Sequence, residues 1–157
     1  MTQDLEQLEA DYAKLGETIK RMKEEKESGL WEPQEGVTYF SISPRGIVFE
    51  NVWEDEYCDH LFLARGNVFR TKEEAEKADR KRILETKLHS FTKGFKPDWG
   101  GIQHKFYIYY DYNSRKFYVT YATCCDCGQV TFKTRLDAEN AIKEMGDELY
   151  ELFGVTK

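Results

Sequence analysis

The residues whose spacing most resembles a chemical site are cysteines. Residues 124–127 read Cys-Cys-Asp-Cys, so Cys124 and Cys127 form a CxxC pair, a spacing that zinc sites use. Cys58 and His60 fall at corresponding positions of a weak internal repeat, so four ligands could meet around one zinc ion. The sequence has no second CxxC, and partly buried thiols at strand ends explain the cluster more simply. We therefore expect no cofactor, with zinc at these four residues as the alternative.

No catalytic constellation stands out in the sequence. The three histidines, His60, His89 and His104, do not adjoin Ser or Cys in a known nucleophile motif. The CxxC pair precedes an expected strand, whereas redox CxxC sites usually open a helix that lowers the pKa of the thiol. Gly100 and Gly101 lack the spacing and the following helix of a phosphate-binding loop. We therefore expect no enzymatic activity and predict no catalytic residue.

Aromatic residues are concentrated in one region and indicate a binding surface. Residues 106–112 read Phe-Tyr-Ile-Tyr-Tyr-Asp-Tyr, and Phe117, Tyr118 and Tyr121 follow. Alternate rings of a strand point to opposite faces, so one face would belong to the core and the other would be exposed. Exposed rings could stack on single-stranded nucleic acid or a nucleotide, or could anchor a protein interface, which we favour. The predicted contact residues are Tyr109, Tyr110, Tyr112 and Tyr118.

An acidic stretch around two rings is a second candidate interface. It could mimic phosphate and engage a basic groove on a partner, because complementary charge steers association. A solvated hairpin loop is the simpler interpretation. The predicted partner-binding residues here are Trp53, Glu54, Asp55, Glu56 and Tyr57.

Composition limits the class of protein and its partners. The chain has 157 residues, of which 40% are hydrophobic, 15% aromatic and 33% charged, as expected for a globular fold. Its net charge of −6 disfavours nucleic acid as a partner and favours basic ones. No apolar run approaches the roughly 20 residues that cross a bilayer, and the first residues are acidic rather than signal-like. We expect a cytoplasmic protein with no membrane partner.

The N-terminal segment has the spacing of a coiled coil. Apolar residues recur at alternating steps of three and four over about three heptads, the pattern of an a/d seam. The sequence therefore predicts a helix over residues 1–27 that pairs with another copy of the chain, followed by a linker over 28–37. Packing of this stripe on the protein's own sheet is the alternative. The predicted oligomerisation residues are Leu5, Leu8, Tyr12, Leu15, Ile19 and Met22.

An internal duplication organises the rest of the chain. Residues 38–59 can be laid on residues 105–126 without a gap, which pairs Tyr39 with Phe106 and Cys58 with Cys125. Downstream, GNVFRTKEEAEKA at 66–78 matches GQVTFKTRLDAENA at 128–141 with one small gap. In both copies an aromatic residue is followed by Thr, an acidic residue three positions later, and Ala-Glu-x-Ala. The match predicts two units of the same architecture.

Each unit is predicted to be an antiparallel β-β-β-α arrangement, which makes the fold class α+β. Short aromatic and β-branched runs predict three strands in each unit. A Thr three residues before an acidic residue predicts a capped helix start, at Thr71 with Glu74 and at Thr134 with Asp137. The first unit spans 38–91 and the second 105–157, joined by a linker over 92–104, with one shared sheet or two lobes left open. The predicted strands are 38–42, 46–53, 60–69, 105–110, 117–123 and 129–133, and the predicted helices are 72–91 and 135–153.

Across nearly its whole length the chain resembles a set of small uncharacterised proteins found in phages and prophages of Gram-positive bacteria. The resemblance is carried by the N-terminal coiled coil, Trp-Glu-Pro at 31–33, the GNVFRTKEEAEKA segment and the block from KFYIYYDY to DAENAIKEMGDELYELFG. It implies an accessory protein that binds a host macromolecule in the cytoplasm of the host bacterium. The most concrete version is an anti-CRISPR-like inhibitor of a defence nuclease. No functional residue is carried over, because the matching motifs are structural.

Overall fold

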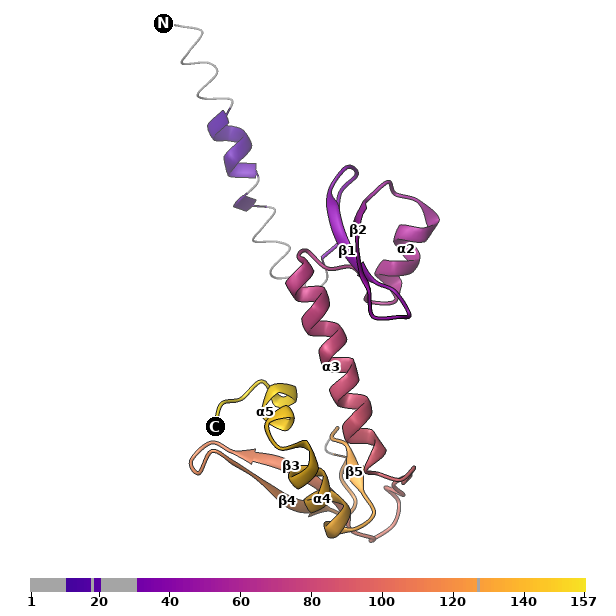
Figure 1. Cartoon of the computed structure of the whole chain (residues 1–157), viewed down its shortest axis with the longest axis vertical. Coiled ribbons are helices and arrows are strands. Elements are labelled where there is room, and N and C mark those ends of the chain that lie inside the picture. Colours follow the sequence, from indigo (N-terminus) through magenta and orange to yellow (C-terminus); the bar gives the residue numbers. More distant parts are fainter. Residues whose placement is uncertain (1–10, 18, 21–30, 127) are drawn as a thin grey trace, which may run out of the picture. The chain divides into compact units, whose positions relative to one another are not determined.

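The computed structural model describes residues 11–17, 19–20, 31–126 and 128–157. The chain divides into two compact units, unit 1 (Met1–Lys77) and unit 2 (Ala78–Lys157), and each is described by itself. Both combine helices with a small antiparallel sheet, so the mixed α+β class is confirmed (Figure 1). The two sheets are separate, which answers the question whether the units share one.

The N-terminal part of unit 1 is helical where it is described, at residues 11–17 and 19–20. Three of the predicted seam residues lie there, and Tyr12, Leu15 and Ile19 are all exposed. Leu5, Leu8 and Met22 lie outside the described residues. Pairing of this helix with a second copy stays a prediction.

A two-stranded hairpin forms the sheet of unit 1. Strands β1 (Thr38–Ile42) and β2 (Val48–Val52) pair antiparallel, with Phe40 opposite Glu50. Gly46 allows the tight turn between them, because its φ of 77° lies in the left-handed region. The other edge of β1 is held at one point, where Phe40 and Phe69 exchange both backbone hydrogen bonds at 2.9 and 3.0 Å.

The strand predicted at residues 60–69 is wrong over most of its length. Residues Tyr57–Ala64 form helix α2, and only Phe69 makes a strand-like bridge. The helix starts here because the carboxylate of Asp59 accepts the backbone N–H groups of Glu54 and Glu56 at 3.0 and 3.2 Å. Aromatic and branched residues favour strands, but a satisfied helix start outweighs that preference. Unit 1 is therefore β-β-α followed by the start of α3, not β-β-β-α.

Helix α3 (Lys72–Ser90) begins in unit 1 and continues into unit 2. Its predicted start is confirmed, because the hydroxyl of Thr71 accepts the backbone N–H of Glu74 at 3.2 Å. The carboxylate of Glu74 in turn accepts the N–H of Arg70 at 3.0 Å. These two bonds satisfy donors that a helix start otherwise leaves unpaired.

Unit 2 contains the larger sheet and two further helices. Strands β3 (Lys105–Asp111), β4 (Lys116–Ala122) and β5 (Thr131–Phe132) are arranged in the order β4-β3-β5. Helices α4 (Arg135–Met145) and α5 (Asp147–Phe153) follow, separated at Gly146, whose φ is 50°. The hydroxyl of Thr134 caps α4 by accepting the N–H of Asp137 at 3.1 Å, which confirms the second predicted helix start.

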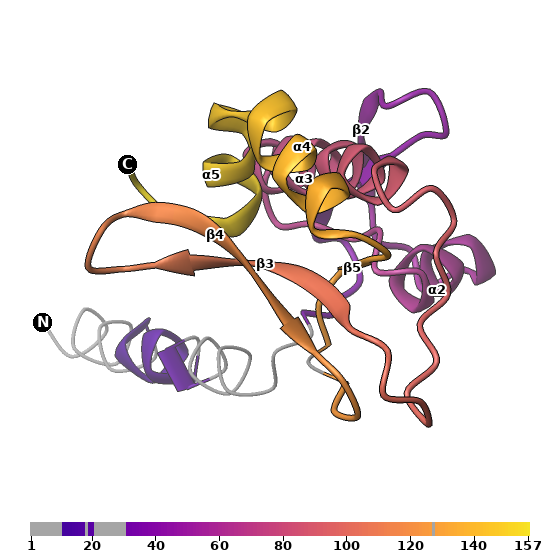
Figure 2. The same ribbon diagram turned by 90° about the horizontal axis from the view of Figure 1, so that it is seen from below.

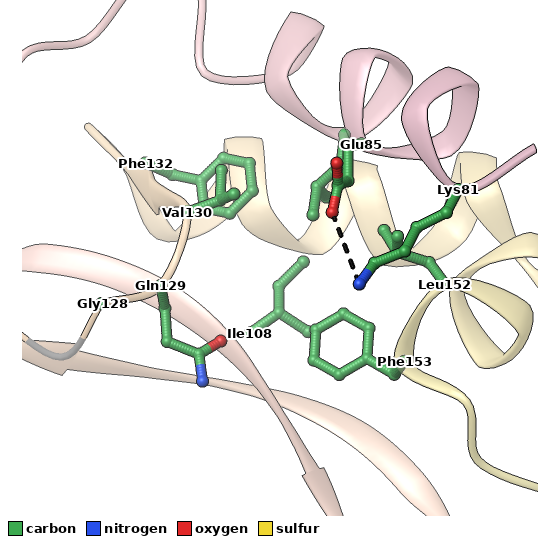
Figure 3. Close-up of a pocket in the computed structure, with 10 residues that line it drawn as sticks. Lys81, Glu85, Ile108, Gly128, Gln129, Val130, Phe132, Leu152 and Phe153 are labelled. Carbon is green, nitrogen blue, oxygen red and sulfur yellow. Dashed lines mark ion pairs between the residues drawn. The ribbon is translucent and has the colours of Figure 1, made fainter. Parts of the chain in front are cut away.

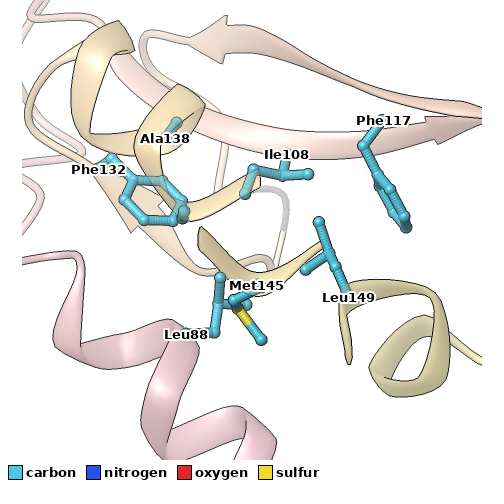
Figure 4. Close-up of a cluster of buried hydrophobic side chains, with 8 residues drawn as sticks. Leu88, Ile108, Phe117, Phe132, Ala138, Met145 and Leu149 are labelled. Atoms are coloured by element: carbon cyan, nitrogen blue, oxygen red, sulfur yellow. The ribbon is translucent and has the colours of Figure 1, made fainter. Parts of the chain in front are cut away.

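Helices α4 and α5 cover one face of the β3–β4 sheet (Figure 2). Side chains from that face, from both helices and from α3 meet in one core (Figure 4). A core on one face leaves the other face of β3 and β4 free to present side chains. The buried core residues are Leu88, Ile108, Phe117, Phe132, Ala138, Ala141, Met145 and Leu149.

Candidate binding surfaces

The sheet face opposite the core of unit 2 presents a pair of tyrosines. Since Ile108 and Phe117 point into the core, their neighbours Tyr109 and Tyr118 point away from it. These two tyrosines are direct cross-strand partners, with ring centroids 5.9 Å apart and planes 32° apart. Each is 41% exposed. We define the tyrosine face as Tyr107, Tyr109, Tyr118 and Thr120, which share this side of β3 and β4.

The charges at the two ends of the tyrosine face are already balanced or buried. At the hairpin end, Asp111 lies directly opposite Lys116. The hydroxyl of Ser114 and nearby backbone N–H groups donate to Asp111 and hold the pKa of its carboxyl below the ordinary value. At the other end, Lys105 is buried and donates to the carbonyls of Gly101 and Thr123 at 2.9 and 2.6 Å. The face therefore offers rings and hydroxyls with little net charge.

Two predicted contact residues lie elsewhere. Tyr110 belongs to the core side of β3, where its hydroxyl donates to the carbonyl of Thr156 and its ring packs against Phe117 at 5.2 Å. Tyr112 is exposed beyond the end of β3, and its ring meets Tyr110 edge-on at 4.9 Å. The four predicted tyrosines therefore do not form one surface. Tyr109 and Tyr118 are the two that come together.

A second aromatic cluster was not predicted from the sequence. The His104 ring stacks on Tyr121 at 4.0 Å with planes 21° apart, and Phe106 packs edge-on against both. The Arg135 guanidinium lies 5.7 Å from the centre of Phe106 and donates to the carbonyl of Val119 at 3.1 Å. His104 falls in the predicted linker and Arg135 at a helix start, so no sequence spacing connects them. The sheet alone brings them together.

The acidic stretch of unit 1 is exposed only in part. Glu54, Asp55 and Glu56 are exposed, and the Oδ1 of Asp55 lies 2.9 Å from the Nε2 of His60. Trp53, in contrast, is 2% exposed and packs edge-on against Tyr39 and His60. The prediction of Trp53 as a partner-binding residue is therefore wrong for this structure. The large ring is needed to fill the small core of unit 1.

Asp59 joins this acidic stretch to the core of unit 1. Its buried carboxylate accepts the hydroxyl of Tyr39 at 2.7 Å, in addition to the N–H groups of Glu54 and Glu56. Burial opposes ionisation, but these hydrogen bonds outweigh it and hold the pKa of Asp59 below its usual value. Burial beside this carboxylate raises the pKa of Tyr39. Asp59 is a structural anion that fixes the start of α2.

The proposed zinc ligands do not assemble among the described residues. Within residues 11–17, 19–20, 31–126 and 128–157, no group of three or more His, Cys, Asp or Glu side chains could hold a metal ion. Cys58 and Cys124 are exposed, and Cys127 lies outside the description. Hydrogen bonds from Thr123 and Cys125, with the positive charge of Lys105, lower the pKa of the Cys124 thiol. Zinc stays an untested alternative.

Unit 2 also contains a mainly apolar hollow of about 270 Å³ (Figure 3). Side chains of Leu88, Ile108, Phe132 and Phe153 form much of its lining. Lys81 and Glu85 line it from α3, where they form an ion pair at 3.9 Å. The hollow borders the core and contains no catalytic arrangement of side chains among its lining residues.

No protein family, curated protein or solved structure matches this chain. In the described part of the chain, no helix is both long and apolar enough to cross a membrane. The comparisons therefore assign no function, and any assignment has to come from the surfaces themselves.

Proposed function

We propose that this chain is a non-enzymatic accessory protein that binds a partner protein through its tyrosine face. The observation that carries the proposal is the exposed cross-strand pair Tyr109 and Tyr118 on a sheet whose other face is packed. Tyrosine offers a large ring at a small cost in conformational entropy, and it is enriched in protein interfaces. The core packed on the other face of the sheet fixes the strands that carry both rings before a partner arrives, which lowers the cost of binding.

The charge distribution favours a protein over nucleic acid as the partner. Single-stranded nucleic acid is held by stacking together with a basic groove that follows the phosphates. On the tyrosine face, Lys116 is balanced by Asp111, and Lys105 is buried at the other end. The net charge of the whole chain is −6. A nucleotide or single-stranded nucleic acid stays the alternative ligand, and the experiment below distinguishes the two.

In its most concrete form, the proposal is that of a phage accessory protein in the host cytoplasm that inhibits a bacterial defence effector such as a CRISPR nuclease. The resemblance to small phage proteins supports this version. The exposed apolar residues Tyr12, Leu15 and Ile19 support self-association through the N-terminal helix. Pairing of two chains would present two tyrosine faces at once and increase avidity.

Two observations support the proposal that the units are duplicated. In each unit the first strand is paired on one side with its hairpin partner and on the other with a short segment before a capped helix. That segment contributes Phe69 opposite Phe40 in unit 1, and Phe132 opposite Phe106 in unit 2. This correspondence aligns Phe40 with Phe106, one residue away from the ungapped sequence comparison.

The test is site-specific photo-crosslinking of the full chain in host lysate. A photoreactive phenylalanine analogue at position 109 should capture a discrete protein. The same analogue at position 136, where exposed Leu136 lies on α4, should not. With the captured protein purified, Tyr109→Ala with Tyr118→Ala should weaken binding by about 2 kcal/mol or more, as loss of an interface hot spot does. Unchanged affinity, or binding only to an oligonucleotide with strong salt dependence, would refute the proposal.

Self-association has a separate test. Leu8→Asp with Leu15→Asp should lower the molecular mass in sedimentation equilibrium to that of one chain, because a charge in an a/d seam opposes pairing. An unchanged mass would mean that the helix does not join copies. The tyrosine face would then act as a single site.

A further inference from the structure

Strand β2 has a free edge in unit 1. The sheet order is β1-β2, so among the described residues β1 covers one side of β2 and no strand covers the other. Two bonds at the ends of the hairpin show which groups point inward. The backbone N–H of Ser43 donates to the carbonyl of Ile47, and that of Trp53 donates to the carbonyl of Val37. Because the pattern alternates, Ile47, Phe49, Asn51 and Trp53 bond toward β1. The N–H and C=O groups of Val48, Glu50 and Val52 therefore point away from it.

An independent pair of bonds gives the same alternation. Phe40 lies opposite Glu50, yet it uses its own N–H and C=O to bond Phe69 on the far side of β1. Phe40 and Glu50 are thus a pair without hydrogen bonds to each other, which leaves both backbone groups of Glu50 directed outward.

The side chains on this edge are apolar around one acid. Val48, Glu50 and Val52 alternate along the strand and so share one face of it. Val52 is 51% exposed, Glu50 is exposed and Val48 is half-buried. Such an edge is a template for another strand, and proteins usually protect it with lysine, proline or a bulge. The sequence of β2, Val-Phe-Glu-Asn-Val, contains no lysine or proline.

Charge selects the kind of strand that fits. Two copies of the chain paired antiparallel through β2 in full register would place Glu50 against Glu50, which is unfavourable. The exposed Glu54, Asp55 and Glu56 follow β2 after one residue, Trp53, and add negative charge at the same end. A basic side chain opposite Glu50 would be attracted both by its cross-strand partner and by this acidic stretch.

We propose that the β2 edge binds an extended, cationic segment of a partner protein as an added strand. The segment would place Lys or Arg opposite Glu50 and apolar residues opposite Val48 and Val52. Main-chain hydrogen bonds would give affinity, and the alternating side chains would give specificity. This second docking surface lies in unit 1 and does not depend on the tyrosine face.

The test uses the full chain and short synthetic peptides. The first peptide has the sequence Thr-Val-Thr-Arg-Thr-Val-Thr and is capped at both ends. Its central arginine and the two valines would face Glu50, Val48 and Val52. Its binding should slow hydrogen exchange at the amides of Val48, Glu50 and Val52, which are free in the edge. The amides of Phe49 and Asn51, already bonded within the hairpin, should change little. Saturating peptide that leaves all three edge amides unprotected would overturn the proposal.

Two modified peptides separate strand addition from other kinds of docking. A peptide with glutamate in place of arginine should bind about tenfold more weakly, since a cross-strand attraction becomes a repulsion. A peptide that keeps arginine but carries N-methyl groups on alternate amides should lose binding, because it cannot complete the backbone bonds. Equal binding of the methylated and unmethylated peptides would refute strand addition.

Two protein variants complete the test. Glu50→Lys should reverse the preference, so that the glutamate peptide binds better than the arginine peptide. Glu50→Pro should abolish binding while keeping the hairpin, because the N–H that it removes points outward and an edge strand tolerates proline. Glu144→Lys, at an exposed site of α4, makes the same charge change and should leave binding unaltered. If the unmodified chain has the molecular mass of a dimer and the Glu50→Pro variant that of one chain, the edge pairs with a second copy. That result would refute the cationic partner.

Discussion

The two units build similar hairpins but leave different parts of them open. In unit 2 the outer strand β4 has one carbonyl, that of Val119, bonded by Arg135 from the first position of α4. In unit 1 the first residue of α3 is Lys72, whose amine instead pairs with Glu76 at 3.6 Å. Both β2 and β4 are thus edge strands, and they differ in that one carbonyl of β4 is bonded by Arg135. The proposed partner surfaces differ accordingly: the edge of β2 in unit 1 and the tyrosine face in unit 2.

The units also differ in what holds them together. Unit 2 packs a sheet against helices around a continuous apolar core. Unit 1 has few buried apolar side chains, chiefly Tyr39, Ile42, Trp53 and Ala75, and relies on the buried carboxylate of Asp59. A small core gains less from hydrophobic burial, so hydrogen bonds carry more of its specificity. Variants in each unit should expose this difference.

The largest effect is expected in the core of unit 2. Phe132→Ala should lower the free energy of unfolding by about 3–5 kcal/mol, since it removes a fully buried ring and leaves a cavity. Thermal or denaturant unfolding followed by a unit 2 signal would measure it. Leu136→Ala, at an exposed site of α4, is the control and should cost less than about 0.5 kcal/mol. Equal effects of the two substitutions would mean that the ring of Phe132 does not belong to the core of unit 2.

A smaller effect is expected at Asp59 in unit 1. Asp59→Asn should cost about 1–3 kcal/mol, because it weakens the bonds to Tyr39 and to two backbone amides. The pKa of Asp59 is held below its ordinary value of 3.8 in the folded state, so ionised Asp59 stabilises unit 1 above that pH. This stability should be lost as the pH falls below 3.8 through the lowered pKa.

Unfolding of the Asp59→Asn variant at pH 7 and at acidic pH would check this prediction. The variant should lack the part of the acid sensitivity that Asp59 contributes. An unchanged acid transition would show that other carboxylates control it and that Asp59 is not the anion on which unit 1 depends.

The helix caps allow a matched comparison between the units. Thr71→Ala and Thr134→Ala each remove a hydroxyl that accepts a backbone N–H at the third position after it. Each should cost about 1 kcal/mol. Thr→Ser at each position keeps the hydroxyl and should restore most of the loss, measured by chemical denaturation. A cost at only one site would show that the two helix starts are not equivalent.

The smallest effect on stability is expected at Arg135. This side chain is half-exposed, so Arg135→Ala should cost less than about 1 kcal/mol. It should, however, free the carbonyl of Val119 and speed hydrogen exchange along β4 relative to the unmodified chain. Arg135→Lys is the control, and we expect it to restore little, because lysine lacks the planar group that reaches both Phe106 and the carbonyl. Unaltered hydrogen exchange would mean that Arg135 does not protect the edge of β4, so that β4 and β2 would be equally open.

Local signals in the sequence determined much of the secondary structure. The capping residues Thr71 and Thr134 marked both helix starts, since a Thr side chain bonds a backbone amide within its own turn. Alternating aromatic and branched residues marked the hairpin strands of both units. The class α+β followed from these signals. The alternation also indicated that one face of these strands is core and the other exposed, but it did not identify Tyr109 and Tyr118 as the tyrosines that share the exposed face.

Tertiary structure alone decided the rest, because those outcomes depend on contacts between residues far apart in the chain. Asp59, whose local bonds to the N–H groups of Glu54 and Glu56 begin helix α2, is also bonded by the hydroxyl of Tyr39, twenty residues away. The side chain of Trp53 is buried in the core of unit 1, although the acidic residues that follow it are exposed. The backbone groups of Glu50 point away from β1 because Phe40, which lies opposite, gives both of its own hydrogen bonds to Phe69. Residue types set what each side chain can do, and long-range packing decided which of them are presented to a partner.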